Sequence, residues 1–241
     1  MKRPESYFLV LIFVRTGEIV KTNEAVELNL EHFDEYYTVI VDRREAIGTS
    51  VQNQRFQLFL KLLPKRSLIL DQGCGTGYVA QLLLDEGHRV DCLDISPIAI
   101  KKCMEFFTLA GFNSETYNLW VQDFLTFEYP ETKYDGIMDL FTLHFVPHED
   151  QKRILESIFR SLKPGGYLFL GIMLTGSIKI SEPNSRITEN GGTLLKVDEI
   201  EAYRCFYLWN PYEIRSVLTN LGFKIIHFYH PLSSIEFICQ K

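Results

Sequence analysis

The sequence of 241 residues lacks a long hydrophobic run. Its longest such run, Tyr7 to Val14, is far shorter than the roughly 20 apolar residues that a membrane-spanning helix needs. Lys2 and Arg3 precede the run, as in a signal peptide, but Arg15 follows it directly and no small-residue cleavage motif is present. We therefore expect no membrane segment, no secretion and a cytoplasmic location.

Paired cysteines are also lacking. The five cysteines are odd in number and include no Cys-x-x-Cys pair, which argues against a disulfide framework and against a zinc knuckle. His227 and His230 flank an apolar run, but no further ligand accompanies them at metal-binding spacing. The sequence therefore predicts no metal site.

Positive charge is in deficit, with 25 Lys and Arg residues against 31 Asp and Glu residues and a net charge of −6. This balance argues against a broad nucleic-acid-binding surface. No internal repeat or low-complexity tract is visible, and 46% hydrophobic residues with 23% charged residues are typical of a globular protein. The length fits one large domain, with or without a small addition.

From residue 68 onward, short apolar runs alternate with amphipathic segments. This alternation predicts a doubly wound, Rossmann-like α/β fold with a mostly parallel sheet covered on both faces. The last two runs are joined by a link too short for a parallel crossover, so we expect the sheet to end in an antiparallel hairpin strand. Seven strands are expected, over residues 68–70, 89–94, 117–121, 136–140, 167–173, 224–229 and 235–239.

Two segments do not follow this rhythm, and we divide the chain accordingly. Residues 1–49 form an N-terminal segment, with a strand-like run, a turn signal at Thr16-Gly17 and helical spacing over 32–47. Residues 50–241 form the main domain. Within it, residues 174–208 are rich in Ser, Asn, Gly, Glu and Thr without a clear period, which is typical of a lid, a binding loop or a mobile segment.

A glycine-rich loop, Asp71-Gln72-Gly73-Cys74-Gly75-Thr76-Gly77, follows the first strand of this pattern. Ligands bind at the carboxyl ends of strands in such folds, and glycines let the backbone approach a ligand closely. The spacing is Gly-x-Gly-x-Gly, not the Gly-x-Gly-x-x-Gly of dinucleotide-binding folds. This difference, together with the terminal hairpin, disfavours an NAD-dependent oxidoreductase.

Aspartates close the next two strands. Asp94 can accept both hydroxyls of a ribose, or it can act as an N-cap for the helix that Ser96-Pro97 opens. Asp123 can accept an adenine amino group while Phe124 packs on the base, or it can be a surface loop residue beside a core ring. Both readings remain open at this point.

Five motifs, taken in order, give the sequence a family resemblance. It resembles the class I S-adenosylmethionine-dependent methyltransferases over roughly residues 50–241. The resemblance implies S-adenosylmethionine as the cofactor and S-adenosylhomocysteine as its product. It also implies a cofactor site of Asp71, Gly73, Cys74, Gly75, Gly77, Asp94, Ile95, Asp123, Phe124 and Leu140. The motifs are Leu70-Asp71-x-Gly73-Cys74-Gly75-Thr76-Gly77, Val90–Asp94 with Ser96, Gln122-Asp123-Phe124, Tyr134-Asp135-Gly136-Ile137 and Leu162-Lys163-Pro164-Gly165-Gly166.

The catalytic residues stay unassigned at this level. Asp139 and His144 lie near the end of the fourth strand and are candidate bases, although Asp139 can equally be a cap and His144 an ordinary loop histidine. The N-terminal segment is a candidate lid over the cofactor, through Tyr36 or Tyr37. The 174–208 insertion is expected on the acceptor side, with Tyr203, Phe206 and Trp209 as candidate pocket residues or core residues.

We therefore expect an enzyme that transfers a methyl group from S-adenosylmethionine to a small-molecule acceptor. An RNA or protein methyltransferase, and a non-catalytic S-adenosylmethionine-binding module, are the alternatives. The acidic charge favours a small acceptor over nucleic acid.

Overall fold

The computed structural model describes residues 11–20, 33, 36–37, 54–175, 179–188, 190–197, 202–231 and 234–241. Within these ranges, none of the helices combines the length and the apolar character needed to cross a membrane.

A seven-stranded sheet forms the centre of the fold, in the strand order β10-β11-β6-β5-β2-β3-β4. The neighbours from β6 to β4 pair in parallel, whereas β11 pairs antiparallel with both β6 and β10. The predicted Rossmann-like sheet and its antiparallel hairpin strand are thus confirmed, except that β6 begins before the predicted residue 167. The strands are β2 (Leu68–Gln72), β3 (Arg89–Asp94), β4 (Tyr117–Val121), β5 (Tyr134–Leu140), β6 (Leu162–Met173), β10 (Lys224–Tyr229) and β11 (Ser234–Gln240).

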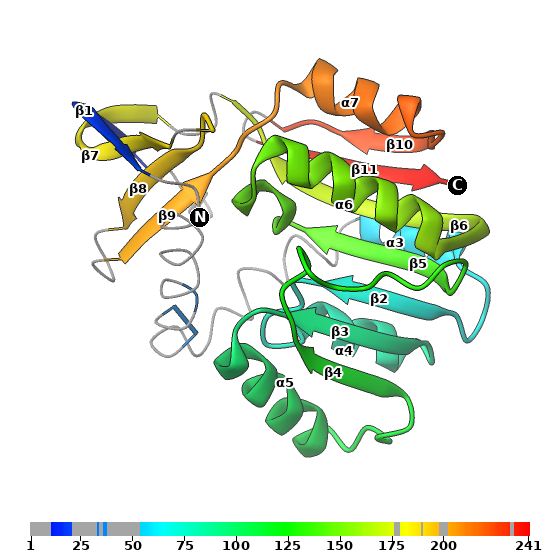
Figure 1. Cartoon of the computed structure of the whole chain (residues 1–241). Coiled ribbons are helices and arrows are strands. Elements are labelled where there is room, and N and C mark those ends of the chain that lie inside the picture. The colour runs from blue at the N-terminus through cyan, green and yellow to red at the C-terminus, as the bar shows by residue number, and fades with distance from the viewer. Residues whose placement is uncertain are drawn as a thin grey trace, which may run out of the picture.

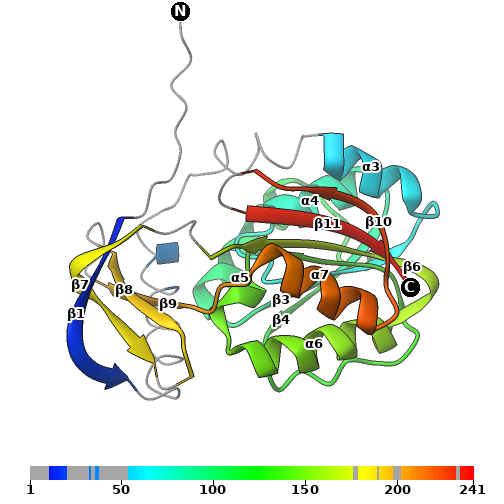
Figure 2. The ribbon, with the colours of Figure 1, turned by 90° about the horizontal axis from the view of Figure 1, so that it is seen from above.

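Helices cover both faces of this sheet (Figures 1 and 2). Successive strand residues point to opposite faces, so that Ile69 packs under α3, α4 and α5 while Leu70 packs under α6 and α7. Ser96 caps α5 by accepting a hydrogen bond from the Ala99 amide at 3.1 Å, as the Ser-Pro signal predicts. The helices are α3 (Gln54–Leu62), α4 (Tyr78–Asp85), α5 (Pro97–Leu109), α6 (His148–Ser161) and α7 (Pro211–Asn220).

A second, four-stranded sheet joins the two segments that lacked a clear rhythm. Its order is β1-β7-β8-β9, and β1 pairs in parallel with β7. The predicted turn at Thr16-Gly17 is wrong, because both residues lie inside β1. Of the predicted helix over 32–47, the structure describes Phe33, Tyr36 and Tyr37, which are helical, and the rest lies outside the described residues. The strands are β1 (Leu11–Val20), β7 (Lys179–Thr188), β8 (Thr193–Val197) and β9 (Ala202–Phe206).

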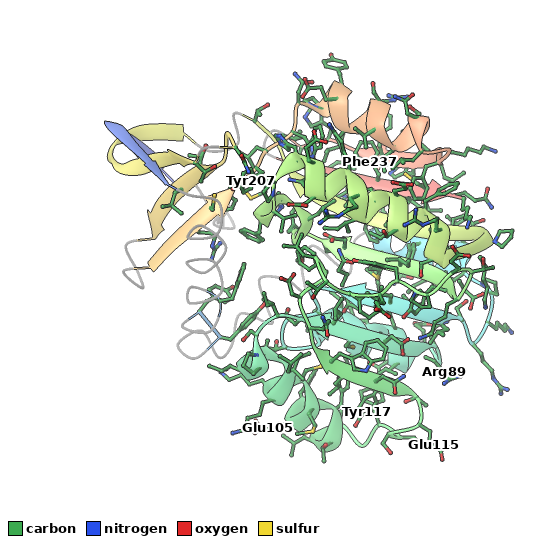
Figure 3. The ribbon with its side chains drawn as sticks, viewed as in Figure 1. Arg89, Glu105, Glu115, Tyr117, Tyr207 and Phe237 are labelled. Atoms are coloured by element: carbon green, nitrogen blue, oxygen red, sulfur yellow. The ribbon has the colours of Figure 1, made fainter. Side chains whose placement is uncertain are left out.

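The small sheet lies beside the edge of the large sheet at which β2, β3 and β5 end (Figure 1). Tyr207 follows β9 at this junction, and its amide donates to the His144 carbonyl at 2.8 Å (Figure 3). His144 belongs to a short 3-10 helix, η1 (Leu143–Phe145), that follows β5. The insertion is therefore attached next to the strand ends where ligands bind in such folds.

Candidate functional site

A cavity of about 340 Å³ lies at the carboxyl ends of the parallel strands. Because these ends share one edge of the sheet, the loops that follow them converge there. Nine of the ten residues predicted to bind the cofactor line this cavity. They are Asp71, Gly73, Cys74, Gly75, Asp94, Ile95, Asp123, Phe124 and Leu140.

The glycine loop is fastened to strand β3 through its backbone. The Gly73 and Cys74 amides both donate to the Leu93 carbonyl, at 2.7 and 3.1 Å. The Gly75 amide donates to Asp94 Oδ2 at 2.9 Å. The loop conformation therefore depends on the end of β3 as well as on its own glycines.

Gly75 and Gly77 have different surroundings. Gly75 has φ +54°, and a Cβ there would lie 2.9 Å from the Tyr37 hydroxyl, within the cavity wall. Gly77 has φ +82° and starts helix α4, where a Cβ would meet Cys103 and the Phe107 ring. The structure thus places Gly77 outside the cavity lining and against the core, although it was predicted with the cofactor residues.

Asp94 faces the cavity, but it is not the N-cap of the helix that follows it. Its side chain is 6% exposed and lines the cavity, while Oδ1 accepts from the Ser96 amide at 3.0 Å and Oδ2 from Gly75. The N-cap of α5 is Ser96 itself. A carboxylate has about four acceptor positions, so a group that holds the loop and the start of α5 can also face the cavity.

Asp71 places an unsatisfied acceptor at the cavity. The residue is 3% exposed, and its Oδ2 has no hydrogen-bond partner among the described residues. Burial, followed by the neighbouring Cys103, Asp94 and Asp139, raises the pKa of its carboxyl to about 8. A buried acceptor without a partner is costly, so this position fits a ligand with a cationic donor such as an ammonium group.

Asp123 and Phe124 line the cavity where β4 leads into the next loop. Asp123 Oδ1 accepts from the Leu125 amide at 2.8 Å, and Phe124 is 8% exposed and packs in the core under α6 and α7. An acceptor beside an apolar ring matches the needs of an adenine base. The cavity wall therefore holds acceptors that fit an ammonium group, a hydroxyl group and an adenine base.

Neither candidate base lines the cavity. Asp139 is fully buried and accepts from Gln72 Nε2 and from the Thr142 and Leu143 amides; burial raises its pKa to about 7. His144 is 1% exposed and its ring stacks on Phe206, while burial and then Arg204 lower its pKa to about 3. Their surroundings favour structural roles in the turn after β5.

The sequence reasoning missed several residues of the cavity wall. Phe141 and Thr142 follow β5 directly, and Phe141 has φ +63°, an unfavourable backbone conformation for a side chain of this size. Arg204 comes from β9, and its guanidinium lies 5.7–5.8 Å from the ring centres of Phe33, Tyr36 and Phe145. In the sequence, Phe141 and Thr142 could have been recognised because they directly follow a predicted strand, whereas Arg204 had no comparable indication.

The aromatic candidates of the insertion divide differently. Phe206 and Trp209 are 3% and 5% exposed and do not line the cavity, so they are core residues; the side chain of Tyr203 lies outside the described ones. Tyr36 and Tyr37 of the N-terminal segment do line it.

Comparison with known proteins identifies this architecture. A family model described as a methyltransferase domain matches residues 69–166, which contain the glycine loop and the strands around it. The matched residues, 69–166, form a methyltransferase domain, the kind of domain that the motifs resemble. S-adenosylmethionine is the cofactor, as the motifs implied.

Two curated relatives show how varied similar chains are. The chain is 30% identical, over 178 residues, to the S-adenosyl-L-methionine-dependent Diels-Alderase iccD of Talaromyces variabilis. The match covers 70% of this chain and 60% of that protein. It is 27% identical, over 146 residues, to the 2-heptyl-1-hydroxyquinolin-4(1H)-one methyltransferase of Mycobacteroides abscessus, matching 57% and 63%. The chain thus spans less than two thirds of either relative.

The solved structures agree on the fold. The Burkholderia thailandensis 1,6-didemethyltoxoflavin-N1-methyltransferase, with 1,6-didemethyltoxoflavin and S-adenosylhomocysteine bound, is similar with a TM-score of 0.64. It is 15% identical, and the match covers 95% of this chain and 93% of that one.

Proposed function

We propose that this protein transfers a methyl group from S-adenosylmethionine to a small-molecule acceptor. The observation that carries the proposal is one continuous cavity whose wall contains the cofactor residues predicted from the motifs and a second, largely aromatic set. The cofactor supplies an electrophilic methyl group on a sulfonium sulfur. The remaining chemistry is the task of the chain.

Cofactor binding is assigned to the strand ends. The glycine loop and Asp71 take the amino-acid end, Asp94 takes the ribose, and Asp123 with Phe124 takes the adenine. The unpartnered Asp71 Oδ2 supports the first assignment, since an ammonium group would satisfy it. The position of the buried Asp94 carboxylate in the cavity wall supports the second.

The acceptor is assigned to the remaining, largely aromatic part of the cavity lining, which includes Phe33, Tyr36, Phe141, Phe145 and Val146. Rings at this density favour an apolar acceptor with a flat face, because aromatic groups bury a large area and pack in offset or edge-to-face pairs. The names of the Mycobacteroides abscessus and Burkholderia thailandensis proteins, both methyltransferases of small molecules, support this choice.

We do not assign the role of general base to Asp139 or His144, because neither side chain lines the cavity. In methyl transfer the attacking atom, the methyl carbon and the leaving sulfur must lie in line, so much of the rate enhancement comes from alignment. Exclusion of water by the aromatic wall adds to it. The acceptor then presents its nucleophile without a proton transfer to these two side chains.

The cavity lining also suggests roles for the two irregular segments, residues 1–49 and 174–208. We propose that the N-terminal segment, residues 1–49, is a lid over the cofactor, supported by the cavity position of Tyr36 and Tyr37. We propose that the 174–208 insertion lies on the acceptor side, supported by the position of Arg204 in the cavity wall. We also propose a reducing, cytoplasmic location, supported by the absence of disulfides among the five cysteines.

A second function has specific support. The similarity to a Diels-Alderase that depends on S-adenosyl-L-methionine favours, as the alternative, a reaction that uses the bound cofactor without consuming its methyl group. RNA acceptors are disfavoured by the net charge of −6.

The test is a methyl-transfer assay with methyl-labelled S-adenosylmethionine and a panel of small aromatic hydroxy and amino compounds. We expect label to appear in one acceptor class together with an equal amount of S-adenosylhomocysteine. The Gly75→Val variant is the control and should form neither. Product formation from a panel member with the cofactor unconsumed would overturn methyl transfer in favour of the alternative.

A further inference from the structure

Three cysteines far apart in the sequence meet beneath the glycine loop. The sulfur atoms of Cys74, Cys92 and Cys103 all lie within 4.8 Å of one another. Cys74 belongs to the glycine loop, Cys92 to β3 and Cys103 to α5. Their exposures are 7%, 0% and 0%, and none is in a disulfide. Because the three come from separate elements, no local spacing rule could detect them.

The separations suit a metal ion bound by sulfur. A tetrahedral ion with metal–sulfur bonds of about 2.3 Å holds its sulfurs about 3.8 Å apart. Because the sulfurs already lie within 4.8 Å of one another, each sulfur-to-sulfur distance needs to shorten by no more than about 1 Å to reach this spacing. Thiolates are soft ligands and select ions of the zinc, cadmium and copper(I) class.

An ion also needs a route to a buried site, and Cys74 provides one. It lines the same cavity as the cofactor residues, between Gly73 and Gly75. Cys92 and Cys103 lie behind it in the core under α3, α4 and α5. An ion entering through the cavity therefore reaches Cys74 first.

We propose that Cys74, Cys92 and Cys103 form a binding site for one thiophilic cation of the zinc class, held by three thiolates. On binding, three S–H bonds break, three metal–sulfur bonds form and three protons pass to solvent. Binding therefore strengthens as pH rises. The ion would join the glycine loop to β3 and α5, and it would stabilise the folded chain because the unfolded chain offers no such site. This proposal does not depend on the methyl-transfer reaction.

The experiment is a titration of the reduced full-length chain with Cd²⁺, followed by the ultraviolet sulfur-to-cadmium charge-transfer absorption and by equilibrium dialysis. We expect one Cd²⁺ per chain, displacement by Zn²⁺ and a raised melting temperature. Cys92→Ala and Cys103→Ala should each weaken binding at least tenfold. Cys239→Ala is the matched control, because Cys239 is equally buried but lies on β11 away from the cluster, and it should bind as the wild type does.

Circular dichroism first checks that each variant folds. If a core variant does not fold, Cys74→Ser supplies the test, since Cys74 lies on the loop at the cavity wall and serine is close to cysteine in size. Absence of the charge-transfer band, or a band that the cluster variants leave unchanged, would overturn the proposal.

Discussion

Asp94 accepts a hydrogen bond from the Gly75 amide at 2.9 Å. The side chain that we propose binds the ribose of the cofactor therefore also holds the glycine loop in place. The other oxygen of the carboxylate accepts from the Ser96 amide at 3.0 Å, at the start of α5. A loop that carries a ligand is thereby fixed before the ligand arrives, which reduces the entropy lost on binding. A change at Asp94 should therefore lower cofactor affinity in two ways, by removing the proposed contact with the ribose and by loosening the glycine loop.

We predict that Asp94→Ala weakens S-adenosylhomocysteine binding by roughly 1.5–3 kcal/mol, the range of a hydrogen bond to a charged group. This corresponds to about 10- to 150-fold in Kd, measured by calorimetry. Asp85→Ala is the control, because Asp85 is an exposed residue at the end of α4. Equal affinity in the Asp94 variant and the wild type would remove Asp94 from the site.

Gly75→Val should abolish cofactor binding, since its Cβ would lie 2.9 Å from the Tyr37 hydroxyl and the rest of the side chain would enter the cavity. Gly87→Val is a matched control: Gly87 also has a positive φ, +79°, but nothing lies within 4 Å of a Cβ there. The control should lose about 1–2 kcal/mol of stability from backbone strain and keep its affinity. Similar cofactor affinity in the two variants would contradict this account of the loop.

Nine of the ten residues predicted at the cofactor site line the cavity because they lie at or after strand ends. Asp71, Asp94 and Asp123 each come where an apolar run ends, and parallel strands bring such ends to one edge. Arg204 could not be found in this way, since it lies on β9, in a polar segment without a strand-like period. Strands of this kind depend on pairing with neighbours more than on their own composition.

The thiol cluster was missed for a related reason. Cys74, Cys92 and Cys103 become neighbours only when the loop, β3 and α5 pack together, and the spacing rules for metal sites apply to ligands close in sequence. Gly77 shows the opposite case, because a motif position that looked like part of the ligand site packs against Cys103 and Phe107.

Stability should fall as pH rises because of Asp71. Burial raises the pKa of its carboxyl from 3.8 to about 8, so between these values the folded chain keeps a proton that the unfolded chain has lost. The free energy of unfolding therefore decreases with pH over this window, by at most about 1.4 kcal/mol per pH unit for one group, and this contribution is constant above about pH 8.

Asp71→Asn should remove this slope. The measurement is urea unfolding of the wild type and the variant, without cofactor, at several pH values from 5 to 8. The difference in unfolding free energy between the two proteins should change steadily across this range. Parallel pH profiles would show that Asp71 is ionised in the folded chain.

Phe141→Asn should separate the two halves of the cavity. Asparagine tolerates the left-handed backbone that Phe141 adopts at φ +63°, so the variant should fold while losing the ring. We expect a KM for the acceptor raised by about tenfold, the scale of losing an apolar contact, and an unchanged affinity for S-adenosylhomocysteine. Phe228→Asn, an exposed ring on β10, is the control, and an equal effect in both variants would contradict the assignment.

Calorimetric titration of the wild-type chain with S-adenosylhomocysteine, S-adenosylmethionine and NAD tests the central claim most directly. The account predicts saturable, one-to-one binding of both S-adenosyl compounds and no saturable binding of NAD. Saturable binding of NAD with no binding of either S-adenosyl compound would contradict it.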